Sequence, residues 1–524
     1  MRTFVDDIAE HAARAPRRIA LTTPGGDLTY AELVHRIDAL ASVLLERGAG
    51  AETVCAVAVP RGADAVVAVA AAVRCGAAFL TLDVEQPPAR LAALVRSGGA
   101  DLLLTTSGLA RRLELPAPGR PVLTDCPDAA AAAPASAAAR VAPPDPRALA
   151  YVSHTSGTTG EPAAVLVEHG SLDSYLRFVA RDYGLGPATV ALQIAPPGYD
   201  ASIRDTFAPL LAGGRLVLLP RAELLRPESF GAAVRAHSVT ALLSVTPSFL
   251  AFLAGRPDAR RLFAGLELVV SSGESLRPFL TAGGRDLIRG ALVNQYGPTE
   301  CTMTSTRHVV PAEPDTAADI VGTPIDGVVV RLLDDALEPV PQGAVGEVCI
   351  GGVGVARGYR GLPARTAERF VPDPFGPPGA RLYRTGDLAE AGPGGLRYLG
   401  RNDRQVKIRG HRVDPAEVEG ALLAHARVAQ AVVTAGTDDL GRGHLIAHVT
   451  GDLADVTDAA LRVHLGRTLP PHLMPRRFVR LDEMPTTRGG KADRRTLAGA
   501  GTAGEPVAGT VPEPVAGARA GGTL

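Results

Sequence analysis

A strand–helix–strand succession near the N-terminus constrains the fold of this chain more than any other feature. Residues 54–59 form a short apolar run closed by Pro60, residues 65–74 have a helical pattern that stops at Gly76, and residues 78–83 form a second apolar run. Short apolar runs between turn residues are typical of buried strands. Because strands that alternate with helices indicate a wound layer of sheet and helix, the sequence predicts the α/β class.

Composition excludes several classes of function. The chain has 524 residues, with 54 Lys and Arg against 55 Asp and Glu, so no basic surface for nucleic acid or a polybasic membrane patch is indicated. The five cysteines are scattered without a C-x-x-C pair, which fits a reduced compartment. The N-terminus is acidic where a signal peptide needs an apolar core, and the run 65–73 is too short to span a bilayer. We expect a soluble, cytoplasmic protein with no nucleic-acid or membrane partner.

A run of glycines and small hydroxylated residues follows the apolar segment 148–152. It consists of Thr155, Ser156, Gly157, Thr158, Thr159 and Gly160. Glycines allow close backbone approach, and backbone N–H groups with hydroxyls can surround phosphate oxygens. The alternative is an ordinary Ser/Thr/Gly turn. It is not the common nucleotide-triphosphate loop, because no Gly-Lys-Ser/Thr follows.

Further motifs follow in a fixed order. They are Leu28-Thr29-Tyr30-Ala31-Glu32-Leu33, Arg74-Cys75-Gly76-Ala77-Ala78-Phe79 with Asp83, the 155–160 loop with Pro162, Tyr199-Asp200-Ala201-Ser202, 294–300, Gly346-Glu347 with Ala356-Arg357-Gly358-Tyr359, 383–388, 400–410, Leu469-Pro470 with Met474-Pro475, and 490–494. In this order the chain resembles an amino-acid-activating adenylation domain of nonribosomal peptide synthesis, within the acyl-CoA synthetase and luciferase superfamily of adenylate-forming enzymes. The resemblance runs from about Phe4 to Leu497.

The resemblance implies a domain organisation. Residues 1–402 would form a large adenylate-forming core of layered sheets and helices, and residues 403–498 a small mobile α+β lid. Asp403 matches the hinge position, about which the family's lid rotates between two poses. The Ala/Pro-rich residues 128–146 are predicted to be a surface connection. The Ala/Gly/Pro/Thr-rich tail, residues 499–524, is predicted to be disordered.

The resemblance also assigns residues to ATP and Mg²⁺. The 155–160 loop would hold the β- and γ-phosphates, and Glu300 would bind Mg²⁺, a cation that prefers carboxylate oxygen; the alternative for Glu300 is a surface acid that caps a helix. Tyr296 would stack on adenine. Asp387 would accept from both ribose hydroxyls, although Thr-Gly-Asp taken alone is more often a plain turn. The backbone around adenine would come from Asn294, Gln295, Gly297, Pro298 and Thr299.

Three cations would serve the chemistry. Lys491, in the Thr- and Gly-rich segment 486–491, would bridge the substrate carboxylate and the α-phosphate, a task that suits a compact ammonium on a flexible stem. Arg401 and Lys407 would reach the ribose and phosphate side, although either could instead be a solvated charge. In the second lid pose the face at 407–410 would be presented for attack by a phosphopantetheine thiol.

The chain departs from the family pattern at two positions. The phosphate loop usually continues Pro-Lys-Gly, whereas here it reads Pro162-Ala163-Ala164. Loss of one charge-assisted contact would weaken ATP binding by about 1.5–3 kcal/mol unless another cation replaces it. The second departure, Thr81 where proline is usual, is minor.

The pocket positions carried over from the family indicate the substrate. Asp200 matches the aspartate that binds the α-ammonium of amino acids. The remaining lining would be Ala201, Arg204, Ser244, Val270, Ser272, Gln295, Met303 and Thr304, closed by Lys491. A buried arginine needs an anionic or strongly accepting partner, so we hypothesise a substrate with an acidic or acceptor-rich side chain. The alternative is that Asp200 and Arg204, four apart on one helix, pair with each other.

The resemblance leaves three interpretations of function. The first is a free-standing enzyme that loads a separate carrier protein, with or without a small MbtH-like helper, since no Leu-Gly-Gly-x-Ser follows Lys491. The second is an acyl- or aryl-CoA synthetase, which Asp200 disfavours. The third is a catalytically weak binding scaffold, supported only by Ala163.

Overall fold

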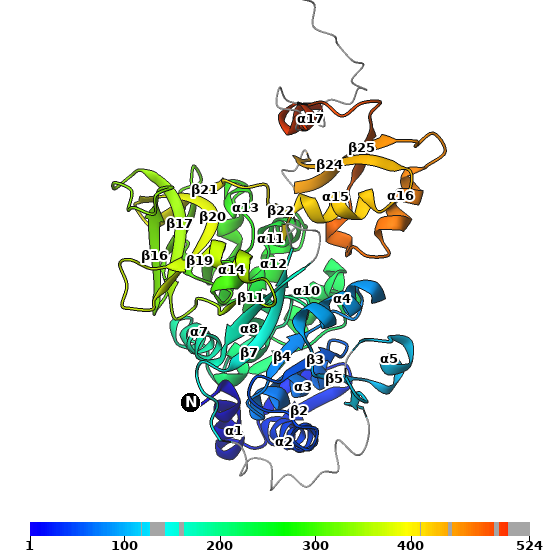
Figure 1. The fold of residues 1–524 in the computed structure, drawn as a ribbon. Helices are drawn as coiled ribbons and strands as arrows, with labels where there is room; N and C mark the ends of the chain where they lie inside the picture. The colour runs from blue at the N-terminus through cyan, green and yellow to red at the C-terminus, as the bar shows by residue number, and fades with distance from the viewer. Residues whose placement is uncertain are drawn as a thin grey trace, which may run out of the picture.

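The computed structural model describes residues 1–116, 118–125, 142–156, 162–408, 410–438, 443–486 and 492–500. These residues form a large N-terminal domain and a smaller C-terminal domain, and the smaller one lies at the end of the molecule opposite the N-terminal helices (Figure 1). Most of the predicted surface connection and almost all of the predicted tail lie outside the described residues. Helix α17 reaches Ala500, so the first two residues assigned to the tail are helical.

One sheet of the large domain carries the strand–helix succession that the sequence predicts. Its seven strands run in the order β18-β8-β7-β4-β3-β5-β6, and β4, β3, β5 and β6 are parallel neighbours. The strands are β3 (Val54–Ala58), β4 (Ala78–Thr81), β5 (Leu102–Thr105), β6 (Val122–Leu123), β7 (Leu149–Thr155), β8 (Ala163–Glu168) and β18 (Gly358–Tyr359).

A fourteen-stranded sheet forms the rest of the large domain. Its order is β16-β17-β20-β21-β15-β14-β13-β12-β11-β9-β10-β1-β2, with β19 beside β20. The strands are β1 (Ile19–Thr23), β2 (Gly26–Thr29), β9 (Val190–Leu192), β10 (Arg215–Val217), β11 (Ala241–Val245), β12 (Leu268–Ser272), β13 (Ala291–Tyr296), β14 (Thr306–Val309), β15 (Asp319–Pro324), β16 (Val328–Leu333), β17 (Val345–Gly352), β19 (Phe370–Pro372), β20 (Arg381–Gly392) and β21 (Gly395–Arg401). Strands β11, β12 and β13 are parallel, so their carboxyl ends share one edge.

Helices pack against both sheets. They are α1 (Phe4–Arg14), α2 (Tyr30–Glu46), α3 (Ala63–Arg74), α4 (Pro88–Gly98), α5 (Ser107–Arg112), α7 (His169–Asp182), α8 (Ala201–Leu211), α9 (Arg221–Leu224), α10 (Pro227–Ala236), α11 (Pro247–Ala254), α12 (Ala259–Phe263), α13 (Arg277–Thr281) and α14 (Pro363–Arg369), with the 3₁₀ turns η2 (Gly284–Leu287) and η3 (Thr299–Cys301). Helix α7 packs on β7 and β8 of the first sheet, and α8 packs on β9, β10 and β11 of the second. Because α7 and α8 also pack on each other, one apolar core joins both sheets.

Helix α2 begins after the N-cap residue Thr29. The Thr29 hydroxyl accepts from the Glu32 amide at 3.2 Å, and the Glu32 carboxylate accepts from the Thr29 amide at 2.8 Å. This reciprocal capping satisfies two amides at the start of α2 that have no partner within the helix.

The C-terminal domain has the predicted α+β character. A hairpin of β22 (Val406–Ile408) and β23 (His411–Val413) precedes a three-stranded sheet of β24 (Val428–Thr437), β25 (Gly443–Gly451) and β26 (Arg477–Arg480). Its helices are α15 (Pro415–Leu423), α16 (Asp458–Leu465) and α17 (Arg494–Ala500), with the turn η4 (Pro471–Leu473). Leu422 and Leu461 are fully buried in a separate core. We call residues 403–498 the lid.

Two motif segments contain more strand than their turn residues indicate. Residues 294–296 complete the buried strand β13, and the turn that the composition of 294–300 favours follows them and leads into η3. Residues 383–388 look like a strand that ends in a turn, but β20 continues through them as a strand of 12 residues. Gly386 has φ +73, a value outside the extended region. The strand nevertheless continues on both sides of it, because β20 pairs with β17 and β21 there.

Candidate functional site

Asp387, in the middle of β20, is the centre of one cluster of candidate residues. Its Oδ2 accepts from the Tyr296 hydroxyl at 2.6 Å. Its Oδ1 accepts from Arg401 Nη1 at 2.6 Å and from the Tyr398 hydroxyl at 3.2 Å. Arg401 lies directly opposite Asp387 in the β20–β21 pairing. The structure therefore brings together the residues expected to contact adenine and ribose.

The expected hinge residue joins this cluster. Asp403 accepts from Arg401 through both carboxylate oxygens, each at 2.7 Å. Burial raises the pKa of Asp403, but the Arg401 guanidinium outweighs it and the pKa is lowered overall. Arg401 thus links the Asp387 cluster to the segment where the chain passes into the lid.

Lys407, on the lid strand β22, lies over the same two aromatic rings. Its ammonium is 5.5 Å from the Tyr296 ring centre and 5.0 Å from that of Tyr398. Burial lowers the pKa of Lys407, against the opposing charge of Asp387. Lys407 is therefore not a solvated surface charge. Lys491 lies outside the described residues.

Glu300, in η3, is fully buried and held by two partners. Its Oε1 accepts from the Tyr359 hydroxyl at 2.8 Å, and its Oε2 from Arg412 Nη1 at 3.1 Å. Burial raises the pKa of Glu300, but Arg412 and then Tyr359 outweigh it and lower the pKa overall. Glu300 is therefore not a surface helix cap.

Only the start of the expected phosphate loop lies among the described residues. Thr155 ends β7, and the Ser156 hydroxyl donates to the backbone oxygen of Arg412 at 3.0 Å and accepts from the Asp414 amide at 3.0 Å. Gly157, Thr158, Thr159 and Gly160 lie outside the described residues. Ala163, which stands where the family usually has lysine, is the first residue of β8 and packs in the core.

The turn between β13 and η3 has a close backbone approach that requires glycine. A Cβ on Gly297 would lie 2.6 Å from the Ser305 amide nitrogen and 2.6 Å from the Thr304 Cα. Pro298 and Thr299 follow, and Thr299 begins η3. The side chain of Asn294, also expected near adenine, donates its amide to the Ile320 carbonyl at 2.8 Å.

Helix α8 carries the two charged residues of the expected amino-acid pocket. Asp200 is its N-cap residue, and Arg204 lies one turn further along. The Oδ2 atom of Asp200 is buried and has no hydrogen-bond partner among the described residues. Burial raises the pKa of Asp200 and outweighs the hydrogen bonds that the carboxylate accepts from the Thr299 side chain and the Ala201 backbone and the nearby charge of Arg204. A buried carboxylate in this state favours a cationic partner.

Arg204 is 1% exposed and donates to neutral oxygens from neighbouring elements. Its partners are Ser244 Oγ (3.1 Å from Nε and 2.8 Å from Nη2), the Tyr175 hydroxyl (3.0 Å), Gln295 Oε1, Thr304 Oγ1 (3.3 Å) and Ser272 Oγ (3.5 Å). None of the ion pairs found between described residues includes Arg204. The alternative in which Asp200 and Arg204 pair is therefore not what the structure shows.

The other expected pocket residues surround the same helix. Ala201 accepts from the Ser244 hydroxyl at 3.1 Å, and Val270 and Met303 are buried in the core on which α8 packs. Sequence reasoning missed Tyr175 and Tyr183 of the α7 region, which contact Arg204 and Gln295 respectively. It also gave no role to Arg412. Only the three-dimensional approach of distant segments identifies these three residues.

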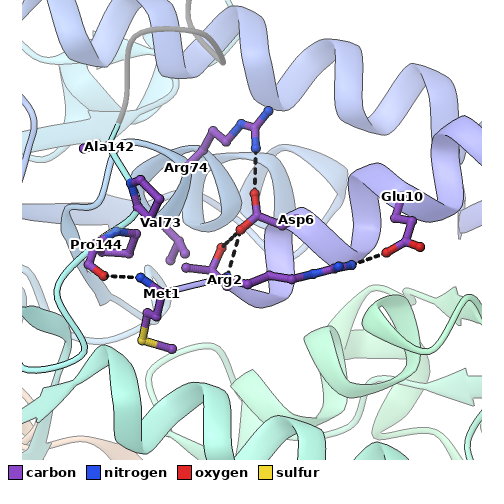
Figure 2. Close-up of a pocket in the computed structure, with 10 residues that line it drawn as sticks. Met1, Arg2, Asp6, Glu10, Val73, Arg74, Ala142 and Pro144 are labelled. Carbon is purple, nitrogen blue, oxygen red and sulfur yellow. Dashed lines mark hydrogen bonds and ion pairs between the residues drawn. The ribbon is translucent and has the colours of Figure 1, made fainter.

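A cavity of about 540 Å³ lies elsewhere, at the N-terminus (Figure 2). It is lined by Met1, Arg2, Asp6, Glu10, Arg74 and their neighbours, and the Met1 amine donates to the Pro144 carbonyl at 2.7 Å. Its charged residues pair with one another, as Arg74 does with Asp6 at 3.0 Å. None of the candidate site residues lines it.

Comparison with known proteins identifies the family. The model of the AMP-binding enzyme family matches residues 8–360. The chain belongs to this family. The model of the AMP-binding enzyme C-terminal domain matches residues 417–491. Within the part of the chain that the structure describes, no helix is long and apolar enough to cross a membrane.

Individual relatives point to nonribosomal peptide synthesis. The chain is 39% identical over 504 residues to the phosphinothricin tripeptide synthetase PhsC of Streptomyces viridochromogenes, with 95% of this chain and 45% of that protein covered. It is 34% identical over 499 residues to a dimodular nonribosomal peptide synthase of Bacillus subtilis, with 94% and 20% covered. The chain thus spans less than half the length of these two relatives.

Solved structures agree with the fold. PA1221, a nonribosomal peptide synthetase protein with adenylation and PCP domains, superposes with a TM-score of 0.80 at 30% identity over 94% of this chain and 84% of that one. The amide bond synthetase McbA of Marinactinospora thermotolerans superposes with a TM-score of 0.81 at 24% identity, over 95% of this chain and 99% of that one. This second match supports the fold and nothing further. Together the matches indicate an adenylate-forming, ATP-dependent ligase of the nonribosomal peptide type.

Proposed function

We propose that this chain activates an amino acid as its aminoacyl adenylate and transfers the aminoacyl group to a phosphopantetheine thiol. The observation that carries the amino-acid assignment is the buried Oδ2 of Asp200, which has no hydrogen-bond partner among the described residues. An α-ammonium would supply the charge and the donors that this oxygen lacks. An aryl or fatty acid has no such group, so the interpretation as an acyl- or aryl-CoA synthetase is disfavoured.

In the first reaction, a carboxylate oxygen of the amino acid attacks the α-phosphorus of ATP, and the bond to the bridging oxygen breaks to release pyrophosphate. Two anions must approach each other, so preorganised cations and dipoles are needed where charge accumulates. We assign the bridge between the carboxylate and the α-phosphate to Lys491, on the strength of its motif. Tyr296 and Asp387 would orient adenine and ribose, with Arg401 and Lys407 beside them.

Glu300 fits a Mg²⁺ ligand. Its carboxylate is buried with a lowered pKa, and its two oxygens accept from Tyr359 and from Arg412. Among the described residues no group of three or more His, Cys, Asp or Glu side chains gathers to form a metal site. As is usual for this ion, a Mg²⁺ held by Glu300 would also bind phosphate oxygens and water. When bound, it would neutralise phosphate charge.

In the second reaction, the thiolate sulfur attacks the acyl carbon, and the bond to the adenylate oxygen breaks to release AMP. The lid hairpin β22–β23 already lies beside the nucleotide residues, with Lys407 over Tyr296 and Tyr398. We take this to be the pose for transfer, and we place the hinge at Asp403 between a core of residues 1–402 and a lid that ends near residue 498. The acceptor we propose is a phosphopantetheinylated carrier protein.

The substrate we propose has an anionic side chain. Arg204 is buried one helical turn from Asp200, and its hydrogen-bond partners are neutral oxygens. The buried carboxylate of Asp205 interacts with Arg204 through its charge and forms no ion pair with it. A dicarboxylic amino acid would place its α-ammonium at Asp200 and its second carboxylate near Arg204. A charge-assisted hydrogen bond of this kind is shorter and stronger than one between neutral groups.

The direct test is the mass of a carrier protein after incubation with this enzyme, ATP, Mg²⁺ and glutamate or aspartate. The assay is run with and without an MbtH-like protein, and with coenzyme A as a competing acceptor. We expect the carrier mass to rise by one aminoacyl group, with pyrophosphate released in equal amount. Pyrophosphate release with transfer only to coenzyme A would support a CoA synthetase instead, and a protein that binds ATP without turnover would support the binding scaffold.

A further inference from the structure

Arg412 reaches from the lid into the site expected for Mg²⁺. It lies on β23, and its guanidinium contacts the fully buried Glu300 at 3.1 Å. The remaining oxygen of Glu300 accepts from Tyr359. Arg412 thus places its positive charge against Glu300 in this pose, and it does so from the domain that has to move.

A second contact occupies the start of the phosphate loop. The Ser156 hydroxyl is shared between the Arg412 carbonyl and the Asp414 amide, both on the lid. This hydroxyl therefore faces the lid backbone where it would otherwise face phosphate oxygens. Two residues expected to hold the magnesium–phosphate group, Glu300 and Ser156, are engaged by the same three-residue stretch of the lid.

We propose that Arg412 and Mg²⁺ compete for Glu300, so that the lid reaches this pose only after the magnesium–pyrophosphate complex has left. The inference rests on the proposed function, because it takes Glu300 to be the metal ligand. A guanidinium and a divalent cation repel each other and cannot share one carboxylate oxygen at contact distance. Arg412 is then a positioning residue, which couples departure of pyrophosphate to presentation of the lid hairpin for thiol attack.

A different role for Arg412 predicts the opposite result. Ala163 leaves the phosphate loop without its usual lysine, and Arg412 is a cation close to that loop. If Arg412 replaced the lysine, its removal would weaken nucleotide binding. If Arg412 competes with Mg²⁺, its removal makes the binding-competent pose more populated and tightens nucleotide binding, since the apparent dissociation constant scales inversely with that population.

The test is calorimetric binding of a non-hydrolysable ATP analogue with Mg²⁺ to the wild type, Arg412→Gln and Arg412→Lys. A matched control is Arg480→Gln, which removes an arginine whose partner, Asp458, lies within the lid itself. We expect Arg412→Gln to bind the complex roughly three- to tenfold more tightly than the wild type. The affinity of Arg412→Lys should lie between those of the wild type and Arg412→Gln, and the affinity of Arg480→Gln should equal that of the wild type.

A distance measurement gives a readout independent of binding strength. Leu225 of the large domain and Val463 of the lid are both 64% exposed and can be changed to cysteine for a fluorophore pair. The magnesium–analogue complex should change the distance in the wild type, and Arg412→Gln should show the changed distance before ligand is added. Unchanged or weaker binding by Arg412→Gln, or a distance insensitive to Mg²⁺, would overturn the inference and leave the proposed function standing. If no variant binds the magnesium–analogue complex, both this inference and the proposed function are contradicted.

Discussion

Replacing Arg204 tests the pocket most sharply. In Arg204→Met the side chain keeps a similar length and loses its charge. In the structure Arg204 donates twice to the Ser244 hydroxyl oxygen, from Nε at 3.1 Å and from Nη2 at 2.8 Å, and it also donates to Tyr175 and Gln295. A charge-assisted hydrogen bond to the substrate would contribute about 1.5–3 kcal/mol. At about 1.4 kcal/mol per tenfold, the variant should lose roughly ten- to 150-fold in kcat/KM for the acidic substrate.

The assay compares kcat/KM for pyrophosphate–ATP exchange with glutamate, glutamine and leucine. We expect Arg204→Met to lose exchange with glutamate selectively, while leucine stays level or improves because a buried charge no longer has to be desolvated. Thermal unfolding controls for stability, since Ser244, Tyr175 and Gln295 lose a donor. Arg204→Lys, which keeps the charge and loses the planar fork, should retain part of the glutamate activity. An equal loss with all three amino acids would show that Arg204 only holds the pocket together and would refute the reasoning.

Four further predictions follow from other parts of the structure. Asp200→Asn should raise the KM for the amino acid about tenfold or more through loss of a charge-assisted contact, without lowering the melting temperature, because burial disfavours the carboxylate. Glu300→Gln should weaken the dependence of exchange on Mg²⁺, measured by titration of the metal. Burial, with His411 and nearby arginines, lowers the pKa of His472 to about 2, so below pH 6.5 the unfolded chain binds a proton that the folded chain excludes. The melting temperature should therefore fall as the pH drops from 7 to 5, and it should fall less in His472→Gln. Leu422→Ala should destabilise the lid by about 2–5 kcal/mol in denaturant unfolding.

Local signals in the sequence predicted much of the scaffold. The short apolar runs at 54–59 and 78–83 became β3 and β4, and the helical pattern at 65–74 became α3. These elements depend on neighbours in the chain, so periodicity describes them well. The wrong expectation at 383–388 has the opposite cause, since pairing with β17 and β21 overrides the turn preference of Thr385-Gly386-Asp387.

In the candidate site, too, local motifs predicted some residues and missed those that depend on long-range packing. The motifs located Asp387, Glu300 and Asp200, because each lies in a recognisable stretch. They did not predict that Tyr175, 29 positions before Arg204, would share its guanidinium, or that Arg412 would reach Glu300 across 112 positions. Such contacts depend on the packing of α7 on α8 and of the lid on the large domain, which no local pattern encodes.

The most direct test of the central claim is amino-acid-dependent pyrophosphate–ATP exchange by the wild-type protein with a panel of aspartate, glutamate, their amides, diamino acids and apolar amino acids. The account predicts exchange with an acidic amino acid or its close acceptor-rich analogue, abolished by Lys491→Ala. Exchange only with small apolar amino acids would keep amino-acid activation and contradict the Arg204 assignment. Silence across the panel from a folded protein would contradict the central claim itself.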